Sequence, residues 1–385
     1  MSSKKRTRYT IIVSGGGTGG HYYPALAIME AIRQRSSELP ASLRIDCHYV
    51  GSSFGIEARL APQSDFPCTL IPVRGFSRYM TFKAQARNLL LPFRLLISFI
   101  RIALLYRRLD PVATVATGGY ASAIPGQLSN LRHIPLFVQE QNAYPGVTSR
   151  LLAKKAMAFF YAYEAVKEHI RNDVLFIRSG NPLRNAIRRI PREEARKKMD
   201  LKNDVFTLFV FGGSQGSASI NRYLAKRIES WIYKYGIQVL WQTGESSYAE
   251  LNRTLGTNPN IRLMKYINEM SAAYSACDMV ISRAGALSLA EIEQLRVPAI
   301  LIPLPGAAGN HQYFNAKTLE ALGCAYLIEE KEFPNNPFTP ILNAMIRDPQ
   351  QLEKMRAAFP EREENAADGI ARNILNRLQS FYAWS

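Results

Sequence analysis

The sequence predicts an α/β protein of two domains, each with a parallel sheet and helices on both faces. Its 385 residues favour two domains over one. Apolar strands alternate with amphipathic helices along most of the chain. Two glycine-rich loops, at residues 15–20 and 212–216, each follow an apolar strand and open a helix. We therefore expect two nucleotide-type domains that face a shared cleft.

The first half of the chain predicts one such sheet. Its strands are expected at residues 9–13, 43–50, 112–116, 134–138 and 174–177. A helix is expected over residues 22–35, where Leu26 and Ile32 belong to one apolar face. Parallel sheets bind ligands at the carboxyl ends of their strands, and Gly17, Gly118 and Asn142 fall at such ends.

The second half restarts the pattern after a Gly–Pro junction at residues 179–182, with a basic helical stretch expected over residues 184–199. Further strands are expected at residues 207–211, 238–242, 262–265, 279–282, 299–303 and 325–328. An amphipathic helix at about residues 366–385 is expected to cross back to the first domain. The predicted domains are therefore residues 1–180 with that helix, and residues 181–365.

The composition is that of a basic globular protein. Lys and Arg number 48 against 31 Asp and Glu, which gives a net charge of +17 and a pI of about 9.8. This excess attracts anions, whether nucleic acid, acidic lipid headgroups or phosphorylated metabolites, and does not choose among them. The cysteines, Cys47, Cys68, Cys277 and Cys324, match no metal spacing and are expected to be reduced thiols in the cytosol.

A leucine-rich run at residues 89–106 is the nearest approach to a membrane segment. Arg94 and Arg101 interrupt it, whereas a span needs about 20 predominantly apolar residues. Two interpretations stay open: a buried crossover helix, and a basic, apolar face that rests on an anionic membrane surface.

The first glycine loop fits the dinucleotide fingerprint at Gly15, Gly17 and Gly20. However, the second strand ends without the acidic residue that would bind a ribose, which argues against an oxidoreductase. Two interpretations of the loop remain: a phosphate-binding loop, and a tight turn with no role in ligand binding. His21 closes the loop in the first turn of the helix, and it is either structural or a base or donor toward an anion.

The second half contains three further residues that could bind a substrate. Ser214 and the helix-start N–H groups can hold a diphosphate without metal, with a plain turn as the alternative. Glu291 lies about one turn into a helix and can accept both ribose hydroxyls, or it is simply an acid placed near a helix N-terminus. Gln312 suits sugar hydroxyls, while Asn310 is equally suited to helix capping.

Together these segments resemble the MurG family, N-acetylglucosaminyltransferases that complete the lipid-linked disaccharide precursor of peptidoglycan. The segments occur in the family's order and cover most of the chain. They are residues 16–21, 118–122, 140–142, 180–184, 212–216, 283–291 and 311–316. The sequence departs from the family pattern at Gln139, where His is common, and at His311, where a second Gln is frequent.

The resemblance implies a glycosyltransferase-B fold of two Rossmann-like domains. No cofactor is expected, and no protein-bound metal, since the sequence shows no metal-ligating cluster. It implies contacts to the phosphates, the transferred sugar and the nucleotide diphosphate from Thr18, Gly19, Gly20, Asn142, Arg184 and Ser214. It also implies that Ile267 offers backbone groups to uracil and that Gln312 holds the sugar hydroxyls. The nucleotide is then surrounded by Ala286, Leu287, Ser288, Leu289, Ala290 and Glu291, with Glu291 on the ribose.

The implied reaction moves N-acetylglucosamine from its UDP donor to the C4 hydroxyl of undecaprenyl-diphospho-N-acetylmuramyl-pentapeptide, with inversion. The enzyme would thereby serve cell-wall assembly, cell shape and cell division. His21 is the expected base, with an acid elsewhere in the cleft as its competitor. Helix-start N–H groups, Ser214 and Arg283 are expected to stabilise the departing diphosphate.

The basic excess then indicates a peripheral protein on the cytoplasmic face of the inner membrane. The expected dock consists of a basic set around apolar side chains: Arg74, Arg78, Lys83, Arg87, Arg94 and Arg101 with Phe76, Tyr79, Met80, Phe82 and the leucine run. A solvated basic face without a partner is the alternative. A related UDP-hexose:diacylglycerol transferase and a basic nucleic-acid-binding protein are the competing functions; no nucleic-acid partner is expected, since no zinc, homeodomain or RNA-sheet signature is found.

Overall fold

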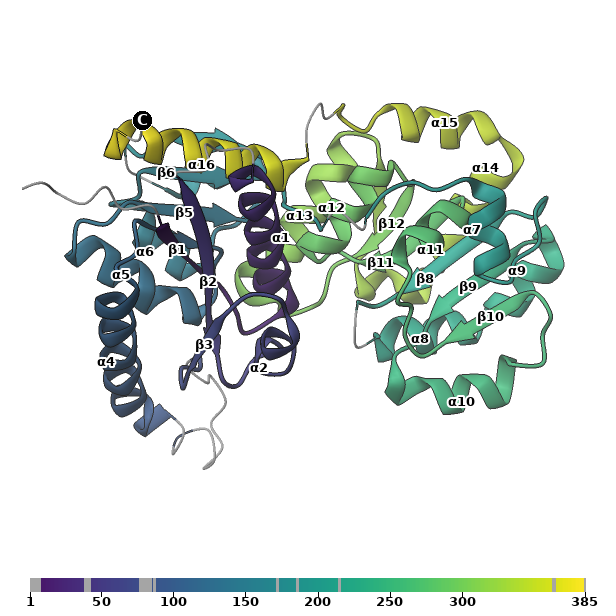
Figure 1. Ribbon diagram of the computed structural model, residues 1–385. Helices are drawn as coiled ribbons and strands as arrows, with labels where there is room; N and C mark the ends of the chain where they lie inside the picture. Colours follow the sequence, from purple (N-terminus) through teal and green to yellow (C-terminus); the bar gives the residue numbers. More distant parts are fainter. Residues whose placement is uncertain are drawn as a thin grey trace, which may run out of the picture. The chain divides into compact units, whose positions relative to one another are not determined.

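The computed structural model describes residues 8–37, 43–75, 85, 88–170, 173–184, 187–213, 216–361 and 365–383. The chain divides into two compact units (Figure 1). The first comprises Met1–Arg184 with Glu364–Ser385, and the second comprises Asn185–Glu363. Each unit is built on a parallel sheet with flanking helices, so the predicted α/β class is confirmed.

The sheet of the first unit has seven parallel strands in the order β3-β2-β1-β4-β5-β6-β7. Their bounds are β1 Arg8–Ser14, β2 Arg44–Ser52, β3 Cys68–Ile71, β4 Ala113–Ala116, β5 Leu136–Glu140, β6 Ala158–Tyr161 and β7 Phe176–Arg178. The strand order reverses between β1 and β4, which pair directly. Ligands of doubly wound sheets bind beside the carboxyl ends of strands at such a switch point.

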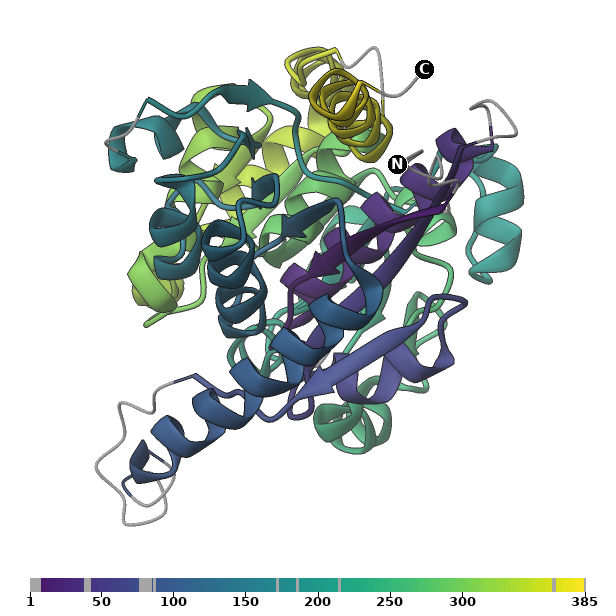
Figure 2. The same cartoon turned by 60° about the vertical axis from the view of Figure 1, so that its left-hand side comes forward.

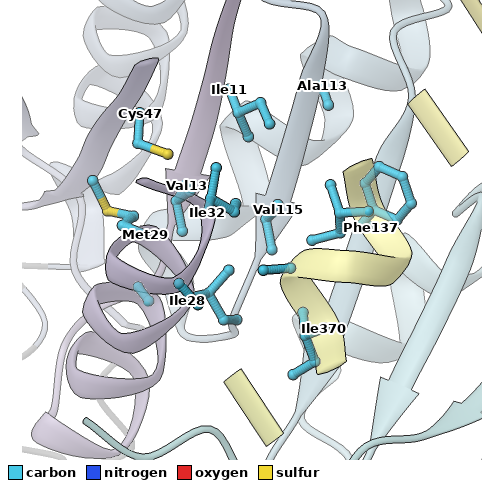
Figure 3. Close-up of a cluster of buried hydrophobic side chains, with 14 of the residues drawn as sticks. Ile11, Val13, Ile28, Met29, Ile32, Cys47, Ala113, Val115, Phe137 and Ile370 are labelled. Atoms are coloured by element: carbon cyan, nitrogen blue, oxygen red, sulfur yellow. The ribbon is translucent and has the colours of Figure 1, made fainter. Parts of the chain in front are cut away.

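Helices on the first unit include one from the far end of the chain. The α-helices are α1 Gly19–Ser36, α2 Glu57–Leu60, α4 Leu91–Leu109, α5 Ala123–Leu131, α6 Val147–Ala153 and α16 Ala366–Tyr382. In the core of Figure 3, Ile370 of α16 and Ile28 of α1 pack with Val13 and Val115 of the sheet. The Tyr382 hydroxyl also donates to a backbone carbonyl just before β4 (3.0 Å). The segment after residue 365 therefore completes the first unit's core.

The second unit has six parallel strands in the order β10-β9-β8-β11-β12-β13, with its switch point between β8 and β11. The strands are β8 Thr207–Phe211, β9 Gln238–Gln242, β10 Ile261–Met264, β11 Met279–Arg283, β12 Ala299–Ile302 and β13 Ala325–Leu327. The α-helices are α7 Arg192–Lys198, α8 Ala218–Ala225, α9 Ile228–Tyr235, α10 Glu245–Leu255, α11 Met270–Ala276, α12 Ala286–Leu295, α13 His311–Ala321, α14 Phe338–Arg347 and α15 Pro349–Ala357.

The predicted helix over residues 184–199 is wrong in its first part, because residues 187–191 are not helical and α7 begins only at Arg192. Pro191 disfavours the helical conformation in the residue before it. The backbone N–H groups of Arg188 and Ile190 donate instead to the hydroxyls of Ser271 (3.1 Å) and Ser275 (3.2 Å). This segment thus lies against α11 as an irregular strap.

A buried arginine fixes α7 to the second sheet. The Arg196 side chain is 1% exposed and donates to the Asp278 carboxylate (3.1 Å) and the Thr207 hydroxyl (2.9 Å). It also donates to backbone carbonyls of Ala276 (3.1 Å), Lys202 (2.9 Å) and Asn203. These bonds satisfy a charge that would otherwise be costly to bury. Arg196 therefore ties α7 to the starts of β8 and β11.

Candidate active site

The first glycine loop connects β1 to α1. Thr18 is the N-cap of α1 in an extended conformation, and its carbonyl accepts from the N–H groups of His21 and Tyr22 (both 3.2 Å). Gly19 and Gly20 are therefore the first helical residues, three residues earlier than predicted. The first N–H groups of a helix have no partner within it, and the helix dipole favours an anion at that end.

The loops that follow β1 and β4 pack directly against each other. The Gly16 N–H donates to the Gly118 carbonyl (3.3 Å). Gly119 has a φ of +76°, and a Cβ atom there would lie 2.0 Å from the Gly16 carbonyl oxygen. Only glycine fits such an approach. The two loops thus form one surface at the switch point of the sheet.

His21 lies on this surface with a defined tautomer. Its Nδ1 is 3.0 Å from the Thr117 carbonyl oxygen and 3.0 Å from Oε1 of Gln141. The backbone carbonyl can only accept a hydrogen bond, so Nδ1 carries the proton. Gln141 is held in turn, since its amide donates to the same carbonyl (2.8 Å). In the neutral form of the ring, Nε2 is therefore the unprotonated nitrogen, the atom with which a general base would accept a proton.

A cavity of about 440 Å³ opens beside His21 within the first unit. Its wall includes Gly17 and Thr18 of the glycine loop, together with Phe54 and Arg74. The Arg74 guanidinium stacks on the Phe54 ring at 3.8 Å from its centroid. The cavity thus combines a candidate base, a helix N-terminus and a fixed cation, which together suit a phosphorylated hydroxyl-bearing ligand.

Glu57 anchors the glycine loop and was not predicted. Its carboxylate is fully buried, and Oε1 accepts from the backbone N–H groups of Gly17 (2.8 Å) and Ser52 (2.9 Å). Oε2 is buried without a hydrogen-bond partner among the described residues. Glu57 lies in a short helix forty residues from the loop, so its only sequence signal is an acid soon after the end of β2.

Two other predicted residues of the first unit lie apart from that cavity's wall. Asn142 follows β5, is half-buried, and donates from both its backbone and side-chain nitrogens to Glu140 (3.0 and 3.1 Å). Arg184 is exposed, with its guanidinium 4.9 Å from the centroid of the Tyr23 ring on α1. Their predicted contacts to the sugar and the diphosphate stay predictions.

The second glycine loop connects β8 to α8, and Ser214 and Gln215 within it lie outside the described residues. Gln242, the buried last residue of β9, donates to the Gly213 carbonyl (2.9 Å). Its Oε1 accepts from the Ile267 N–H (2.8 Å). Gln242 therefore connects the predicted diphosphate loop to the predicted uracil contact. Because the Ile267 N–H is engaged by Gln242, the predicted contact to uracil falls to the Ile267 carbonyl.

Arg283 ends β11 at the switch point, where its guanidinium is engaged by protein groups. It donates to the hydroxyls of Ser217 and Ser219 (both 2.8 Å) at the start of α8, and it pairs with Glu330. It also donates to the Pro303 carbonyl (3.1 Å) after β12. The side chain is only 9% exposed. The geometry thus places Arg283 behind the α8 N-terminus as a support.

The start of α12 carries most of the predicted nucleotide contacts. Ala286, Leu287 and Ser288 form its first turn after the N-cap Gly285, whereas the side chains of Leu289 and Ala290 pack in the core, so these two can offer only backbone groups. Glu291 is half-buried and accepts from the Tyr274 hydroxyl (2.9 Å). Burial, reinforced by Glu291, raises the pKa of Tyr274 well above its ordinary value, so the hydroxyl stays a donor.

Gln312 lies in the first turn of α13, half-buried. Its Oε1 accepts from the Leu304 N–H (3.0 Å), so the amide nitrogen is left to donate to a ligand. The second unit therefore gathers the loop after β8, the end of β11 and the starts of α8 and α12 around its switch point. That is the arrangement in which α/β sheets bind nucleotides.

Helix α4 has one buried face and one exposed apolar face, so the crossover interpretation is confirmed and the membrane-surface interpretation stays a prediction. Ile102, Leu105 and Tyr106 are buried against the sheet, as a crossover helix requires. The opposite face, with Leu89 just before the helix, exposes a row of large apolar side chains, Leu89, Phe93, Leu96, Ile100 and Leu104, each between 49% and 76% exposed. In Figure 2, α4 is the blue helix that extends at lower left, away from the sheet. Among the described residues, no helix combines the length and apolarity needed to cross a bilayer.

Comparison with known proteins defines the class. Residues 11–161 match the N-terminal domain of glycosyltransferase family 28, and residues 207–372 match its C-terminal domain. The fold resembles the crystal structure of Acinetobacter baumannii MurG, with a TM-score of 0.73 and 23% identity over 96% of this chain and 99% of that one. The protein is a glycosyltransferase with the glycosyltransferase-B fold, as predicted.

Full-length relatives give the particular family. A transferase from Salinibacter ruber is 35% identical over 367 residues, which cover 95% of this chain and 96% of the relative. One from Chlorobaculum tepidum is 34% identical over 375 residues, covering 95% and 98%. Both are named UDP-N-acetylglucosamine–N-acetylmuramyl-(pentapeptide) pyrophosphoryl-undecaprenol N-acetylglucosamine transferase. This chain belongs to that family, the MurG family, and the predicted resemblance is confirmed.

Proposed function

We propose that this enzyme transfers N-acetylglucosamine from UDP-N-acetylglucosamine to the C4 hydroxyl of undecaprenyl-diphospho-N-acetylmuramyl-pentapeptide. The reaction is the one named in its relatives. The observation that supports the mechanism is the tautomer of His21, whose Nδ1 donates to the Thr117 carbonyl. His21 lines a cavity whose wall also includes Arg74. The product would enter cell-wall assembly, and through it cell shape and division.

In the transfer, the acceptor oxygen attacks the anomeric carbon as Nε2 of His21 takes the hydroxyl proton. The new C–O bond forms opposite the bond to the diphosphate, which breaks and leaves UDP, so the anomeric configuration inverts. The bond from Nδ1 to the Thr117 carbonyl stabilises the imidazolium that results. Glu57 holds the glycine loop in place through the Gly17 N–H.

On the second unit, the helix starts of α8 and α12 provide N–H groups for the charge that develops on the departing UDP. Arg283 acts as a positioning residue, since its donors are engaged by Ser217, Ser219 and Glu330. Glu291, oriented by Tyr274, receives the ribose hydroxyls, and Ile267 receives the uracil. Gln312 donates to hydroxyls of the sugar.

The deciding experiment measures transfer of radiolabelled sugar by the purified chain from UDP-N-acetylglucosamine, UDP-glucose or UDP-galactose. Each donor is offered a short-chain lipid-linked muramyl pentapeptide or diacylglycerol. Turnover is expected only with the N-acetylglucosamine donor and the muramyl acceptor. Transfer to diacylglycerol would establish the competing transferase, and calorimetry that finds UDP bound no better than other nucleoside diphosphates would refute the nucleotide assignment.

The enzyme would act as a peripheral protein on the cytoplasmic face of the inner membrane, held by the apolar row of α4. Arg101 and Arg107 are exposed on the same helix and can meet anionic headgroups. The residues predicted to extend this dock, Phe76, Arg78, Tyr79, Met80, Phe82, Lys83 and Arg87, lie outside the described residues.

Replacing Leu96 and Ile100 by glutamate should weaken binding to phosphatidylglycerol vesicles at least about tenfold, since each buried side chain of this size contributes about 1.5–3 kcal/mol. Cosedimentation measures the effect. The matched control replaces Tyr233 of α9 and Leu322 after α13, which are 95% and 47% exposed, by glutamate. If both double variants lost vesicle binding to the same extent, α4 would not be the membrane-binding element.

A further inference from the structure

A second cavity, of about 420 Å³, lies wholly within the second unit. Its wall includes Arg189, Arg192, Ser275, Cys277, Val297 and Arg356. Tyr274 also lines the cavity, and its hydroxyl donates to Glu291 of the predicted donor site (2.9 Å). Cys277 precedes β11 and Val297 precedes β12, so the cavity lies at the amino-terminal edge of the sheet. The predicted nucleotide contacts lie at the opposite, carboxyl-terminal edge, so the cavity and the predicted donor site are at different edges of the sheet, with Tyr274 common to both.

Positive charge is concentrated around this cavity. The Asp278 carboxylate accepts from Arg192 (2.7 Å) and from Arg196 (3.1 Å). Arg356 lies 3.8 Å from the same carboxylate and also pairs with Glu353. Two carboxylates are therefore shared by three guanidinium groups before Arg189 is considered.

Arg189 adds a fourth cation without a carboxylate of its own. Its guanidinium donates to the Leu295 carbonyl, and in the described part of the chain no acidic side chain forms an ion pair with it. Partial burial of the guanidinium, and then repulsion from Arg356 and Arg192, lowers the pKa of Arg189. Three of these four arginines, Arg189, Arg192 and Arg356, line the cavity itself, and the ion pairs described for the four involve only the carboxylates of Asp278 and Glu353.

We propose that this cavity binds a small phosphate-bearing anion with at least two negative charges. Guanidinium groups present planar pairs of N–H donors that match phosphate oxygens. A cavity of this size lies within the range of small-molecule sites, so it accommodates a diphosphate or a phosphorylated metabolite. Ile190 and Val297 supply the apolar part of the wall.

The position of the cavity along the chain adds a consequence. Arg189 and Arg192 follow the crossing from the first unit at residues 184–185, and Arg356 precedes the return crossing at residues 363–364. A bound anion would join, within the second unit, the two segments that lead to the first. The ligand would therefore stabilise the strap at residues 187–191 against α15.

Isothermal titration of the full-length chain with inorganic pyrophosphate tests the proposal, with saturating UDP present to occupy the donor site. The wild-type chain should bind pyrophosphate, and Arg189→Gln should weaken that binding at least about tenfold, as loss of a charge-assisted hydrogen bond does. Arg253→Gln removes the same charge from an exposed position on α10 and should leave binding unchanged. Arg74→Gln, which alters the cavity of the first unit, should also preserve this site.

Three results would overturn the proposal: no pyrophosphate binding by wild type at millimolar concentration, equal weakening by Arg189→Gln and Arg253→Gln, or loss of binding only in Arg74→Gln. The melting temperature and UDP affinity of each variant verify that it is folded. Arg189→Lys adds a second readout, because it keeps the charge but loses the planar pair of donors, and it should bind more weakly than wild type. None of these measurements requires transferase turnover.

Discussion

Replacing His21 by glutamine lowers kcat by about 10²- to 10⁴-fold, the usual contribution of a general base. Glutamine retains a donor toward the Thr117 carbonyl but cannot accept the proton from an attacking hydroxyl. The affinity for UDP should stay at the wild-type value, because His21 belongs to the first unit and the donor groups to the second. Steady-state kinetics and UDP titration separate the two effects.

The matched control is His169→Gln. His169 is exposed at the end of a 3₁₀ helix of the same unit, and its ring packs on Tyr144 with the centroids 4.6 Å apart. This variant should keep wild-type turnover. If His21→Gln keeps more than about a tenth of wild-type kcat, less than the usual contribution of a base, the proton goes elsewhere and an acidic residue becomes the candidate.

Replacing Arg196 by methionine lowers the free energy of unfolding of the second unit by about 3–5 kcal/mol, the usual cost of breaking a buried ion pair. Methionine fills much of the volume but leaves the Asp278 carboxylate short of a donor and removes a donor from the carbonyls of Ala276, Lys202 and Asn203, of which Lys202 still accepts from Gln238. Denaturant unfolding of the full chain measures the loss. If the two units unfold at different denaturant concentrations, each transition is analysed separately.

Arg192→Met is the control for this change. Arg192 pairs with the same carboxylate, yet its side chain is 44% exposed. An exposed pair of this kind contributes only about 0–1 kcal/mol. Similar losses in both variants would mean that the buried network around Arg196 is not the element that stabilises α7.

The strands and glycine loops could be predicted because their signals are local. Each of the two loops consists of glycines that directly follow an apolar strand. The fold requires glycine for steric reasons at other points as well, such as Gly119 after β4. β3 and β6 were missed: β3 is short and only partly buried. β6, Ala158–Tyr161, is a four-residue apolar run without alternation, which periodicity cannot distinguish from a buried helix.

The residues that hold the candidate site together were not predicted, since their role depends on distant partners. Glu57 reaches back forty positions to the glycine loop, and Gln242 joins segments on either side of it. Gln139, noted as a departure from the family pattern, is buried and accepts from the Gln141 amide, which in turn orients His21. A single sequence does not reveal such contacts until the sheet order is known.

The return of α16 to the first unit has a consequence for synthesis on the ribosome. Ile370, Ile374 and Leu378 of α16 fill a core whose buried members outside that helix are made more than two hundred residues earlier. The second unit is continuous in sequence and can complete its fold as soon as it emerges. The first unit cannot complete its core until α16 has been synthesised, and until then the apolar residues of α1 that pack on α16 lack these partners. The later half of the polypeptide can therefore finish folding before the earlier half.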